Sequence, residues 1–409
     1  MTGAALRHPP IPLVDGPFVR ILTFSTLFPH AGHPVHGIFV AERLRHLVAT
    51  GEIESRVVAP IPWFPITHPR LNPFVQFGTR APAREAIHGI EVLHPRYFLP
   101  PKIGMTSAPL LLAAGAFATL RRLIANGFDF DLIDAHYFYP DGIAAWLLGR
   151  QLGKPVVITA RGSDLNQIPA HFLPGWMIRR VAERADGLIT VSAALKRVLI
   201  GMDIPDERVT VLRNGVDLER FSPVEREAAR AALGWRGPTL LSVGHLIERK
   251  GHDRIIRALP ELPGVHLAIA GSGALQETLR ALAWELGVAD RVQLLGEIPQ
   301  GQLRRYYSAA DALVLASSRE GWANVLLEAM ACGTRVAATR VWGAPEVVTA
   351  PEAGVLIEGL EPAAIAMSVR DLLARAADPE ATRRHAETFS WEATTRGQLH
   401  LFRDILQGG

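Results

Sequence analysis

Short apolar runs rich in Val, Ile and Leu alternate along the chain with segments that have apolar residues at helical spacing. Continuous apolar runs are typical of parallel strands covered on both faces, and the helices between them supply the crossovers. In the first half, the pattern predicts strands at residues 19–25, 56–60, 90–94, 131–136, 155–160, 187–191 and 208–212. In the second half, it predicts strands at residues 239–244, 265–271, 292–296, 312–317, 335–339 and 354–357. We therefore expect an α/β protein with two Rossmann-like domains, whose parallel sheets face each other across a cleft.

The alternation breaks over residues 213–238, where polar and turn residues replace the apolar runs. This break predicts a linker between an N-terminal domain at residues 18–212 and a C-terminal domain at residues 239–388. Residues 1–17 contain no continuous apolar stretch, so we expect a loose tail rather than a signal peptide. Residues 389–409 have apolar positions at helical spacing, which predicts a final helix that crosses back to the N-terminal domain.

Composition indicates a globular protein without a nucleic-acid partner. The 409 residues suit two domains, 48% of them are hydrophobic and 20% charged, and the net charge is +3. Lys and Arg form no dense runs, which argues against nucleic-acid binding. The single cysteine, Cys332, permits neither an internal disulfide nor a Cys-based metal cluster, so we expect a buried core residue in a protein of a reducing, cytoplasmic compartment. The apolar run at residues 103–120 is at the short limit for a membrane span, and we interpret it as a helix packed on a sheet.

A glycine-flanked pair of cations follows the first predicted strand of the second half. Gly244 ends that strand, and Arg249, Lys250 and Gly251 follow in the next loop. A diphosphate needs cations and close approach of the backbone, so this loop suits a diphosphate ligand. The alternative is a solvated loop with two surface charges. The sequence contains neither a GxxxxGK[ST] phosphate loop nor an HExxH metal motif.

A second glycine-rich turn keeps a different class of enzyme open. Gly271 and Gly273 join a strand to a helix and begin a dinucleotide fingerprint, but Gln276 stands at the third glycine position. A tight strand-to-helix turn is therefore the better interpretation. Glu297 follows the next strand, where it could meet a ribose, so an NAD-dependent oxidoreductase stays a competing hypothesis.

Two carboxylates bracket a mostly apolar segment at residues 320–333. Glu320 and Glu328 are eight residues apart, a little over two helical turns, so on one helix both side chains would lie near the same face. Such a pair is suited to grip one elongated ligand.

Polar side chains also follow two predicted strands of the first half. His136 ends one strand, and Arg161, Ser163 and Asp164 follow the next. The carboxyl ends of parallel strands border the ligand crevice, so these groups are candidates to meet a sugar, although a lone histidine is as often structural. The acidic pair at residues 129–131 resembles a metal-holding motif, but it precedes its strand and therefore lies at the wrong end. We expect no metal site.

Taken together, the chain from Val19 onward resembles the retaining GT-B glycosyltransferases of family 4. The segment from Glu320 to Glu328 is similar to the family's Glu-x7-Glu motif, including the continuation NVLLEAMACG. The segments SVGHLIERKG, AGSGALQETL, VQLLGEIP, VLRNGVDLERF and VWGAPEVV also resemble segments of the family in their order. The segments HPVHGIFVAERLRHL, HYFYPDG and RGSDLN are similar to a subgroup that includes teichuronic-acid-type polysaccharide transferases.

The resemblance implies a nucleotide-sugar donor site in the C-terminal domain and an acceptor site in the N-terminal domain. The glutamate that matches Glu328 would hold the ribose hydroxyls of a nucleotide diphosphate sugar, and the one that matches Glu320 would face the donor sugar. Backbone amides at a helix N-terminus would meet the sugar and the phosphate, since donors and dipole favour negative charge there. These amides belong to Trp322, Ala323, Asn324 and Val325.

The resemblance also implies that cationic side chains replace a metal ion. Arg249 and Lys250 would neutralise the leaving diphosphate, so neither a divalent metal nor a cofactor besides the co-substrate is expected. His136 would contact the donor sugar, and Arg161 and Asp164 would lie on the acceptor or sugar side. Retention of the anomeric configuration would follow from same-face attack, in which the leaving phosphate helps to deprotonate the acceptor hydroxyl.

Three positions depart from the family pattern. The family often has a Gly-Gly loop after its first strand, whereas here only Gly37 is available there for close approach to phosphate, with Gly244 in the second half. Arg335 stands where CGTP is common, and we expect it to alter the edge of the cleft or to point to solvent. Trp342 replaces a small residue.

The resulting hypothesis is a hexosyltransferase that moves a sugar from a UDP- or GDP-sugar to a glycan or lipid-linked glycan in cell-surface polysaccharide synthesis. An NAD-dependent oxidoreductase and an inactive sugar-nucleotide-binding module are the alternatives. The oxidoreductase lacks a complete fingerprint, and the inactive module would be expected to lose Glu320, Glu328 or Lys250, all of which are present.

The first part of the chain is basic and rich in aromatic residues. Residues 1–130 carry 12 Lys and Arg against 7 Asp and Glu, which leaves a net charge of +5. Aromatic and cationic residues are interleaved here: Trp63, Phe64, Phe74, Phe77, Tyr97 and Phe98 with Arg70, Arg96 and Lys102. This pattern suits the interface of an anionic membrane and predicts salt-sensitive, peripheral binding to the cytoplasmic membrane face. Alternatively, the aromatic residues pack under Pro-rich loops.

Overall fold

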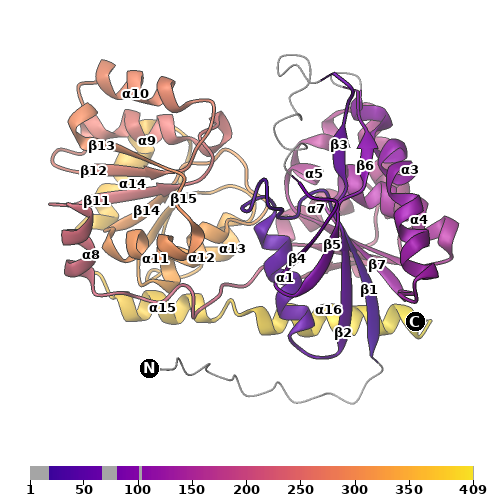
Figure 1. Cartoon of the computed structure of the whole chain (residues 1–409). Coiled ribbons are helices and arrows are strands. Elements are labelled where there is room, and N and C mark those ends of the chain that lie inside the picture. The colour runs from indigo at the N-terminus through magenta and orange to yellow at the C-terminus, as the bar shows by residue number, and fades with distance from the viewer. Residues whose placement is uncertain (1–17, 67–80, 101–103, 409) are drawn as a thin grey trace, which may run out of the picture. The chain divides into compact units, whose positions relative to one another are not determined.

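The computed structural model describes residues 18–66, 81–100 and 104–408 of the chain (Figure 1). The tail expected at residues 1–17 lies outside the described residues, as do Arg70, Phe74, Phe77 and Lys102 of the aromatic and basic segment. The chain divides into two compact units.

Each unit is made mainly of one half of the chain. Unit 1 contains the described residues up to Val191, together with Lys196–Leu212 and the segment from Thr395 onward. Unit 2 contains Ser192–Leu195 and Arg213–Thr394. The main division after Leu212 coincides with the predicted end of the N-terminal domain.

Unit 1 is built on an eight-stranded sheet in the order β10-β9-β8-β7-β1-β2-β5-β4. Neighbouring strands run parallel, except that β4 pairs antiparallel with β5 at one edge. The strands are β1 (Val19–Phe24), β2 (Ile53–Val58), β4 (Arg84–Ile87), β5 (Ile90–Leu93), β7 (Leu132–His136), β8 (Val156–Ala160), β9 (Gly187–Thr190) and β10 (Val209–Val211). The strands predicted in the first half are therefore confirmed.

Helices cover both faces of this sheet. They are α1 (Ile38–Val48), α3 (Gly104–Ala125), α4 (Ile143–Leu152), α5 (Ser163–Asn166), α6 (Phe172–Ala182), α7 (Ala193–Ile200) and α16 (Trp391–Leu406). Leu132 and Val157 share one apolar cluster with side chains of α1 and α16. Ile158, one residue further along β8, closely contacts Gly142 at the start of α4. Since side chains alternate along a strand, α1 and α16 lie on one face and α4 on the other.

Three short strands of unit 1 were not predicted. β3 (Ile61–Trp63) and β6 (Arg96–Phe98) pair with each other in a separate two-stranded sheet, and β4 is the antiparallel edge strand. These strands have 3, 3 and 4 residues and carry proline or charged residues. Segments so short and polar give no apolar run, so the sequence pattern does not reveal them.

Helix α3 is the apolar segment at the short limit for a membrane span. Its length and composition would suffice to cross a membrane, but it packs against β6 and α4 in unit 1. Leu112, Ala116 and Leu120 of this helix are fully buried. Gly115 permits the close packing, because a Cβ there would lie 2.5 Å from the Cβ of Tyr97 on β6. The expected packed helix is present.

The last helix, α16, completes the core of unit 1. Leu399 and Phe402 are buried in the same apolar cluster as Val40 and Leu44 of α1. Gln398 is also buried and bonds to side chains of unit 1 described below. The expected return of the final helix to the N-terminal domain is therefore confirmed.

Unit 2 is built on a six-stranded sheet in the order β13-β12-β11-β14-β15-β16, parallel throughout. Its strands are β11 (Thr239–Val243), β12 (His266–Ala270), β13 (Val292–Gly296), β14 (Ala312–Leu315), β15 (Val336–Thr339) and β16 (Gly354–Ile357), as predicted. Its helices are α8 (Arg226–Leu233), α9 (His252–Ala258), α10 (Gln276–Glu285), α11 (Gln300–Ala309), α12 (Asn324–Ala331), α13 (Ala344–Val347), α14 (Pro362–Ala374) and α15 (Pro379–Glu387). Helices α9, α10 and α14 share one apolar cluster, and α11 and α12 lie on the opposite face (Figure 1).

The segment interpreted as a linker, residues 213–238, belongs to unit 2. It contains α8, and two arginines of this helix form ion pairs with Asp311. Arg226 Nη2 lies 2.6 Å from Asp311 Oδ1, and Arg230 Nη1 lies 3.2 Å from Asp311 Oδ2. Ala229 is the buried residue of this helix. The helix has only eight residues, and its apolar side chains are four alanines and one leucine, which is why its sequence resembles a linker.

Candidate functional site

Lys250, Arg249 and Glu320 form a charged cluster beyond the carboxyl ends of two neighbouring strands of unit 2. The cations lie on η4 (Glu248–Lys250), a 3-10 turn after β11, and Glu320 lies in the loop after β14. Lys250 Nζ is 2.6 Å from Glu320 Oε1, and Arg249 Nη1 is 3.5 Å from Glu320 Oε2. Because β11 and β14 are adjacent in the sheet, groups 70 residues apart in sequence meet here. The structure thus brings together three of the predicted site residues.

The Glu320 carboxylate is buried in its charged form. Burial alone would raise its pKa, but the charges of Lys250 and Arg249 and the hydrogen bonds from Lys250 and Ser317 lower the pKa below its ordinary value. Ser317 Oγ donates to Glu320 Oε1 at 2.7 Å. Arg249 Nη1 also donates to the carbonyl oxygen of Arg319 at 2.9 Å. Glu320 therefore positions both cations, a role that the sequence alone did not suggest.

Two glycines let the cationic loop approach its surroundings. Gly251 has φ +68°, and a Cβ there would lie 2.1 Å from the carbonyl oxygen of Ala316. Gly244 has φ +155°, and its Cβ would lie 3.2 Å from the Lys250 side chain. A larger residue at Gly251 would displace the loop that carries Lys250, and one at Gly244 would press on the Lys250 side chain.

Glu320 does not lie on the helix that carries Glu328, so the interpretation of residues 320–333 as one helix is wrong. Helix α12 begins at Asn324, and the preceding residues form an irregular loop. Trp322 anchors this loop, because its Nε1 donates to the carbonyl oxygen of Asn214 at 3.1 Å. That partner is 108 residues away in the sequence, so a local pattern does not reveal it.

The four residues predicted to offer backbone amides to a donor surround the start of α12. Trp322 and Ala323 are buried, and Asn324 and Val325 are half-buried. Ala323 is the N-cap, and its side chain gives no capping hydrogen bond. The dipole of the helix favours a negative group at this end. Contact of these amides with a donor stays a prediction.

Glu328 lies in the middle of α12 and is held by a tyrosine that the sequence analysis did not identify. Tyr307 on α11 donates its hydroxyl hydrogen to Glu328 Oε2 at 2.7 Å. Burial, and then the charge of Glu328, raise the pKa of Tyr307, so it stays protonated as a donor. The pair fixes one carboxylate oxygen of Glu328. No motif signals Tyr307, which precedes Glu328 by 21 residues on another helix.

His136 lies at the end of β7 as predicted, but its ring is only 1% exposed and both ring nitrogens have partners in unit 1. Nε2 is 3.1 Å from Asp134 Oδ2, and Nδ1 is 2.7 Å from Nη2 of Arg161. Since a guanidinium only donates, Nδ1 accepts and Nε2 carries the hydrogen. Burial lowers the pKa of His136 to about 4, against the effect of the Asp134 carboxylate. The neutral ring of His136 therefore positions Arg161. Both ring nitrogens are engaged, so neither is available for the predicted contact with a donor sugar.

A buried polar network extends from His136 through unit 1. Gln398 Nε2 donates to Asp134 Oδ2 at 3.0 Å, and Arg43 Nε donates to Gln398 Oε1 at 2.7 Å. Arg43 also donates through Nη1 to the carbonyl oxygen of Leu212 at 3.0 Å. The network contains two buried guanidinium groups, those of Arg43 and Arg161, near one carboxylate, that of Asp134.

Two further buried aspartates hold the loops at the same end of the sheet. Asp164 accepts hydrogen bonds from the backbone amides of Phe138, Arg161 and Gly162, at distances of 2.7, 3.0 and 2.6 Å. Asp164 therefore braces the loops after β7 and β8, and its expected place on the acceptor or sugar side stays a prediction. Asp141 accepts from the amide and the hydroxyl of Thr26 at 2.7 and 2.9 Å. Burial raises the pKa of Asp141 to about 7. No sequence pattern signals this role of Asp141.

The departures from the family pattern have structural explanations in two cases. Gly37 has φ +63° before α1, and a Cβ there would lie 2.2 Å from the carbonyl oxygen of Leu27, so chain packing alone requires the glycine. Arg335 is buried and donates from Nη1 to the carbonyl oxygens of Arg375 and Ala376, at 3.1 and 3.3 Å, just after α14. The expectation that Arg335 points to solvent is therefore wrong.

The remaining motifs of the second half have local structural roles. A Cβ at Gly271 would lie 1.9 Å from the carbonyl oxygen of Gly244, and one at Gly273 would lie 2.6 Å from that of Leu246. Close packing of two strand-to-helix loops thus explains both glycines. Glu297 accepts a hydrogen bond from Ser272 Oγ at 3.3 Å. Burial raises the pKa of Cys332 to about 12, which fits the expected core residue.

The acidic pair Asp129 and Asp131 precedes β7 and so lies at the amino end of that strand, as predicted. Asp129 Oδ1 is 2.7 Å from Lys154 Nζ. Asp131 Oδ2 accepts a hydrogen bond from the backbone amide of Arg20, also at 2.7 Å. Both carboxylates therefore have partners in unit 1.

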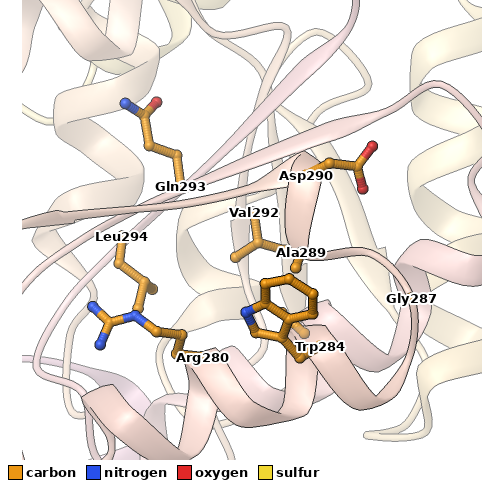
Figure 2. A pocket seen from close by; sticks show the side chains of 9 residues that line it. Arg280, Trp284, Gly287, Ala289, Asp290, Val292, Gln293 and Leu294 are labelled. Atoms are coloured by element: carbon orange, nitrogen blue, oxygen red, sulfur yellow. The ribbon is translucent and has the colours of Figure 1, made fainter.

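A wide cavity of about 640 Å³ lies in unit 2 between the end of α10 and the edge strand β13 (Figure 2). Arg280 and Trp284 approach it from α10, and Val292 and Leu294 from β13, whereas the side chain of Gln293 points to the other side of the strand. The start of a parallel strand is opposite to the carboxyl ends, where the Lys250 cluster lies. This cavity is therefore separate from the candidate site.

Comparison with known proteins gives a match to each half of the chain. Residues 225–389 match a family model described as glycosyl transferases group 1. Residues 99–220 match a family model described as Glycosyltransferase Family 4. A D-inositol 3-phosphate glycosyltransferase of Catenulispora acidiphila is 30% identical over 95% of this chain and 97% of its own length.

Solved structures share the fold across nearly the whole chain. A sucrose-phosphate synthase of Thermosynechococcus elongatus has a TM-score of 0.76 and 21% identity, covering 96% of this chain and 100% of its own. Anabaena HepE in complex with UDP has a TM-score of 0.69 and 20% identity, covering 94% of this chain and 99% of its own. The fold is thus the two-domain GT-B arrangement of parallel sheets.

Proposed function

Because the chain belongs to the glycosyltransferases of group 1 and Family 4, we propose that it moves a sugar from a UDP- or GDP-sugar to a glycan or lipid-linked glycan acceptor in cell-surface polysaccharide synthesis. The observation that carries the donor site is the cluster of Lys250, Arg249 and Glu320 beyond the ends of β11 and β14. It lies where ligands of parallel α/β sheets bind. The acceptor class follows from the sequence resemblance, and the UDP complex of HepE supports the donor class.

Each group of the cluster has a chemical task in the proposed reaction. Lys250 and Arg249 stabilise the negative charge that develops on the leaving diphosphate. Glu320 holds both cations in place and faces the donor sugar, and Glu328 binds the ribose hydroxyls. The leaving phosphate assists deprotonation of the acceptor hydroxyl, so that attack occurs on the same face and configuration is retained.

A ligand screen by thermal denaturation tests the function. A ligand that binds only the folded state raises the midpoint of unfolding, so UDP or GDP is expected to stabilise the protein, whereas NAD is not. Release of the nucleotide from the matching sugar donor, in the presence of an acceptor, then separates an active transferase from an inactive binding module. Stabilisation by NAD alone would favour the oxidoreductase and contradict the proposal.

Glu328→Gln is expected to weaken nucleotide binding by about 1 to 3 kcal/mol, because a neutral amide makes weaker hydrogen bonds to the ribose than a carboxylate does. Isothermal titration with UDP and GDP measures the loss. Tyr307→Phe is the matched control: it removes the 2.7 Å hydrogen bond but keeps the charge, so its loss should be smaller. Equal affinity of Glu328→Gln and the wild type would refute the ribose assignment.

Transfer is expected to survive removal of divalent metals. The two cations of the cluster take the electrostatic part that a metal ion plays in other transferases. Turnover is measured after dialysis against EDTA and again after addition of magnesium or manganese, and the three rates should agree. A strict requirement for added metal would reopen the acidic pair Asp129 and Asp131 as a candidate.

We further propose that the protein is cytoplasmic and works at the cytoplasmic membrane face. The proposal draws on the net charge of +5 in residues 1–130. It also draws on three neighbouring aromatic rings. The ring centroids of Trp63 and Phe64 lie 6.5 and 5.7 Å from the ring centroid of Phe98. Trp63 and Phe98 are exposed, whereas Tyr97 is buried and does not contribute. Such aromatic clusters suit a membrane interface.

A further inference from the structure

Unit 1 has an apolar cavity of about 370 Å³ at the carboxyl ends of β1 and β7. Its described lining contains no charged side chain. The larger side chains are those of Tyr97, Tyr137, Tyr139, Leu99, Met105 and Ile168. They come from β6, the start of α3, and the turns η1 (Phe138–Gly142) and η2 (Ile168–Ala170) with their flanking residues.

Three hydroxyl groups of this lining, those of Thr26, Tyr137 and Tyr139, already have partners in unit 1. Tyr137 Oη is 2.6 Å from Ser163 Oγ, and the hydroxyl of Tyr139 donates to the backbone carbonyl of Met105. Thr26 Oγ1 donates to Asp141 Oδ2 at 2.9 Å. A sugar ring would need several new hydrogen bonds to replace those it makes with water, and this lining offers few. A hydrocarbon group needs none.

An exposed apolar turn follows directly after the cavity wall. Ile168 lines the cavity from η2, and α6 begins four residues later with Phe172, which is 85% exposed. Trp176, one helical turn further, is 57% exposed. Met105 of the cavity wall is exposed as well. Large apolar side chains gathered on a surface mark a contact with another molecule or a membrane.

The same face of α6 becomes basic toward its end. Arg179 and Arg180 follow Trp176 at helical spacing, so Phe172, Trp176 and the two arginines form one stripe. Among the described residues, Arg179, Arg180 and Arg184 form ion pairs with two carboxylates, those of Glu183 and Asp203, which leaves an excess of one positive charge. An apolar end with Trp and Phe followed by arginines complements a bilayer with anionic headgroups.

We propose that the cavity of unit 1 takes the hydrocarbon part of a lipid-linked acceptor, and that the Phe172 to Arg180 stripe rests on the anionic bilayer that contains this lipid. The inference rests on the proposed transferase function and narrows its acceptor from glycans in general to amphiphiles. Soluble sugars without an apolar group are then poor ligands of unit 1. The stripe adds binding energy through apolar burial, so salt alone does not abolish membrane binding.

Co-sedimentation with vesicles of phosphatidylcholine and phosphatidylglycerol tests the stripe. The wild type should sediment, and the double variant Phe172→Ser with Trp176→Ser should bind at least about tenfold more weakly, since two large apolar side chains are lost. Trp284→Ser is the matched control, because Trp284 is 73% exposed but lies on α10 of unit 2. Two results would overturn the proposal. If the double variant binds as well as the wild type, the stripe makes no contact with the membrane. If high salt removes binding completely, charge alone holds the protein there.

Calorimetric titration with octyl glucoside below its micelle concentration, against free glucose, tests the cavity. Octyl glucoside should bind and glucose should not, and Ile168→Asp should weaken octyl glucoside binding at least about tenfold by placing a charge in the wall. Equal binding of glucose would make the cavity a saccharide site and overturn the proposal. Thermal stabilisation by UDP or GDP is measured in parallel for the wild type and each variant. If Ile168→Asp is still stabilised and binds octyl glucoside as the wild type does, only this inference is defeated. If neither nucleotide stabilises the wild type, the proposed transferase function itself is defeated.

Discussion

Replacement of both Arg249 and Lys250 by alanine is expected to abolish sugar transfer, with turnover falling by at least about a thousandfold. Both cations lie beyond the end of β11, where the leaving diphosphate is proposed to bind, and the reaction has no other positive group in the described cluster. Initial rates of nucleotide release at saturating donor measure the loss. Turnover near that of the wild type would refute the assignment.

The same double replacement should also lower the stability of unit 2. This loss of stability has to be separated from the loss of the cations' chemical role. Without its cations the buried Glu320 carboxylate keeps only Ser317 among the partners described above, and breaking a buried ion pair typically costs about 3 to 5 kcal/mol. The matched control pairs Lys250→Met with Glu320→Gln, which removes both charges at once. This pair should regain most of the free energy of unfolding but none of the activity. Recovered activity would mean that Lys250 serves the fold alone.

Asp134→Asn is expected to lower the free energy of unfolding by about 3 to 5 kcal/mol, because it leaves the buried guanidinium groups of Arg43 and Arg161 without their shared carboxylate. Urea denaturation followed by fluorescence measures the change. Asp129→Asn is the control: Asp129 is 62% exposed in its pair with Lys154, so its effect should stay within about 0.5 kcal/mol. A loss below about 1 kcal/mol for Asp134→Asn would contradict the role of the network.

The pH dependence of this effect has a defined sign. Burial would raise the pKa of Asp134, but the neighbouring His136 and then the charges of Arg43 and Arg161 lower it below the ordinary value of 3.8. A carboxylate with a lowered pKa in the folded state contributes stability above its unfolded pKa and loses it as the pH falls through the folded pKa. The difference between wild type and Asp134→Asn should therefore be full at neutral pH and shrink below about pH 4.

The fold follows from the sequence where burial is two-sided. Apart from the edge strand β4, the strands of the central sheets contain apolar runs because helices cover both faces, and this pattern is visible without any tertiary knowledge. The pattern does not reveal β3 and β6. Each of these strands has only three residues, and the two strands pair with each other outside the central sheet, so neither contains an apolar run. Helix α8 escapes the pattern because it has only eight residues and its apolar side chains, four alanines and one leucine, are mostly small.

The site was predictable in its members but not in their arrangement. Lys250 and Glu320 stand in recognisable segments at strand ends, yet their ion pair depends on β11 and β14 being neighbours, which the order along the chain does not state. Tyr307 lies in an ordinary amphipathic helix and has no signal of its own. The burial of His136 depends on Arg161 and Asp134 closing around it, so its strand-end position alone suggested an exposed group.

The return of α16 to unit 1 separates the order of synthesis from the order of folding. Gln398 joins Arg43, 355 residues earlier, to Asp134, and Phe402 fills the apolar core beside α1. The ribosome releases the residues of unit 1 up to Leu212 first, but the pieces that close its core emerge after all of unit 2. Unit 2, which is nearly continuous from Arg213 to Thr394, can therefore complete its core first. Until residues 395–408 arrive, we expect nascent unit 1 to keep an open apolar face and an unfinished charge network, a state in which incompletely folded chains are prone to aggregate.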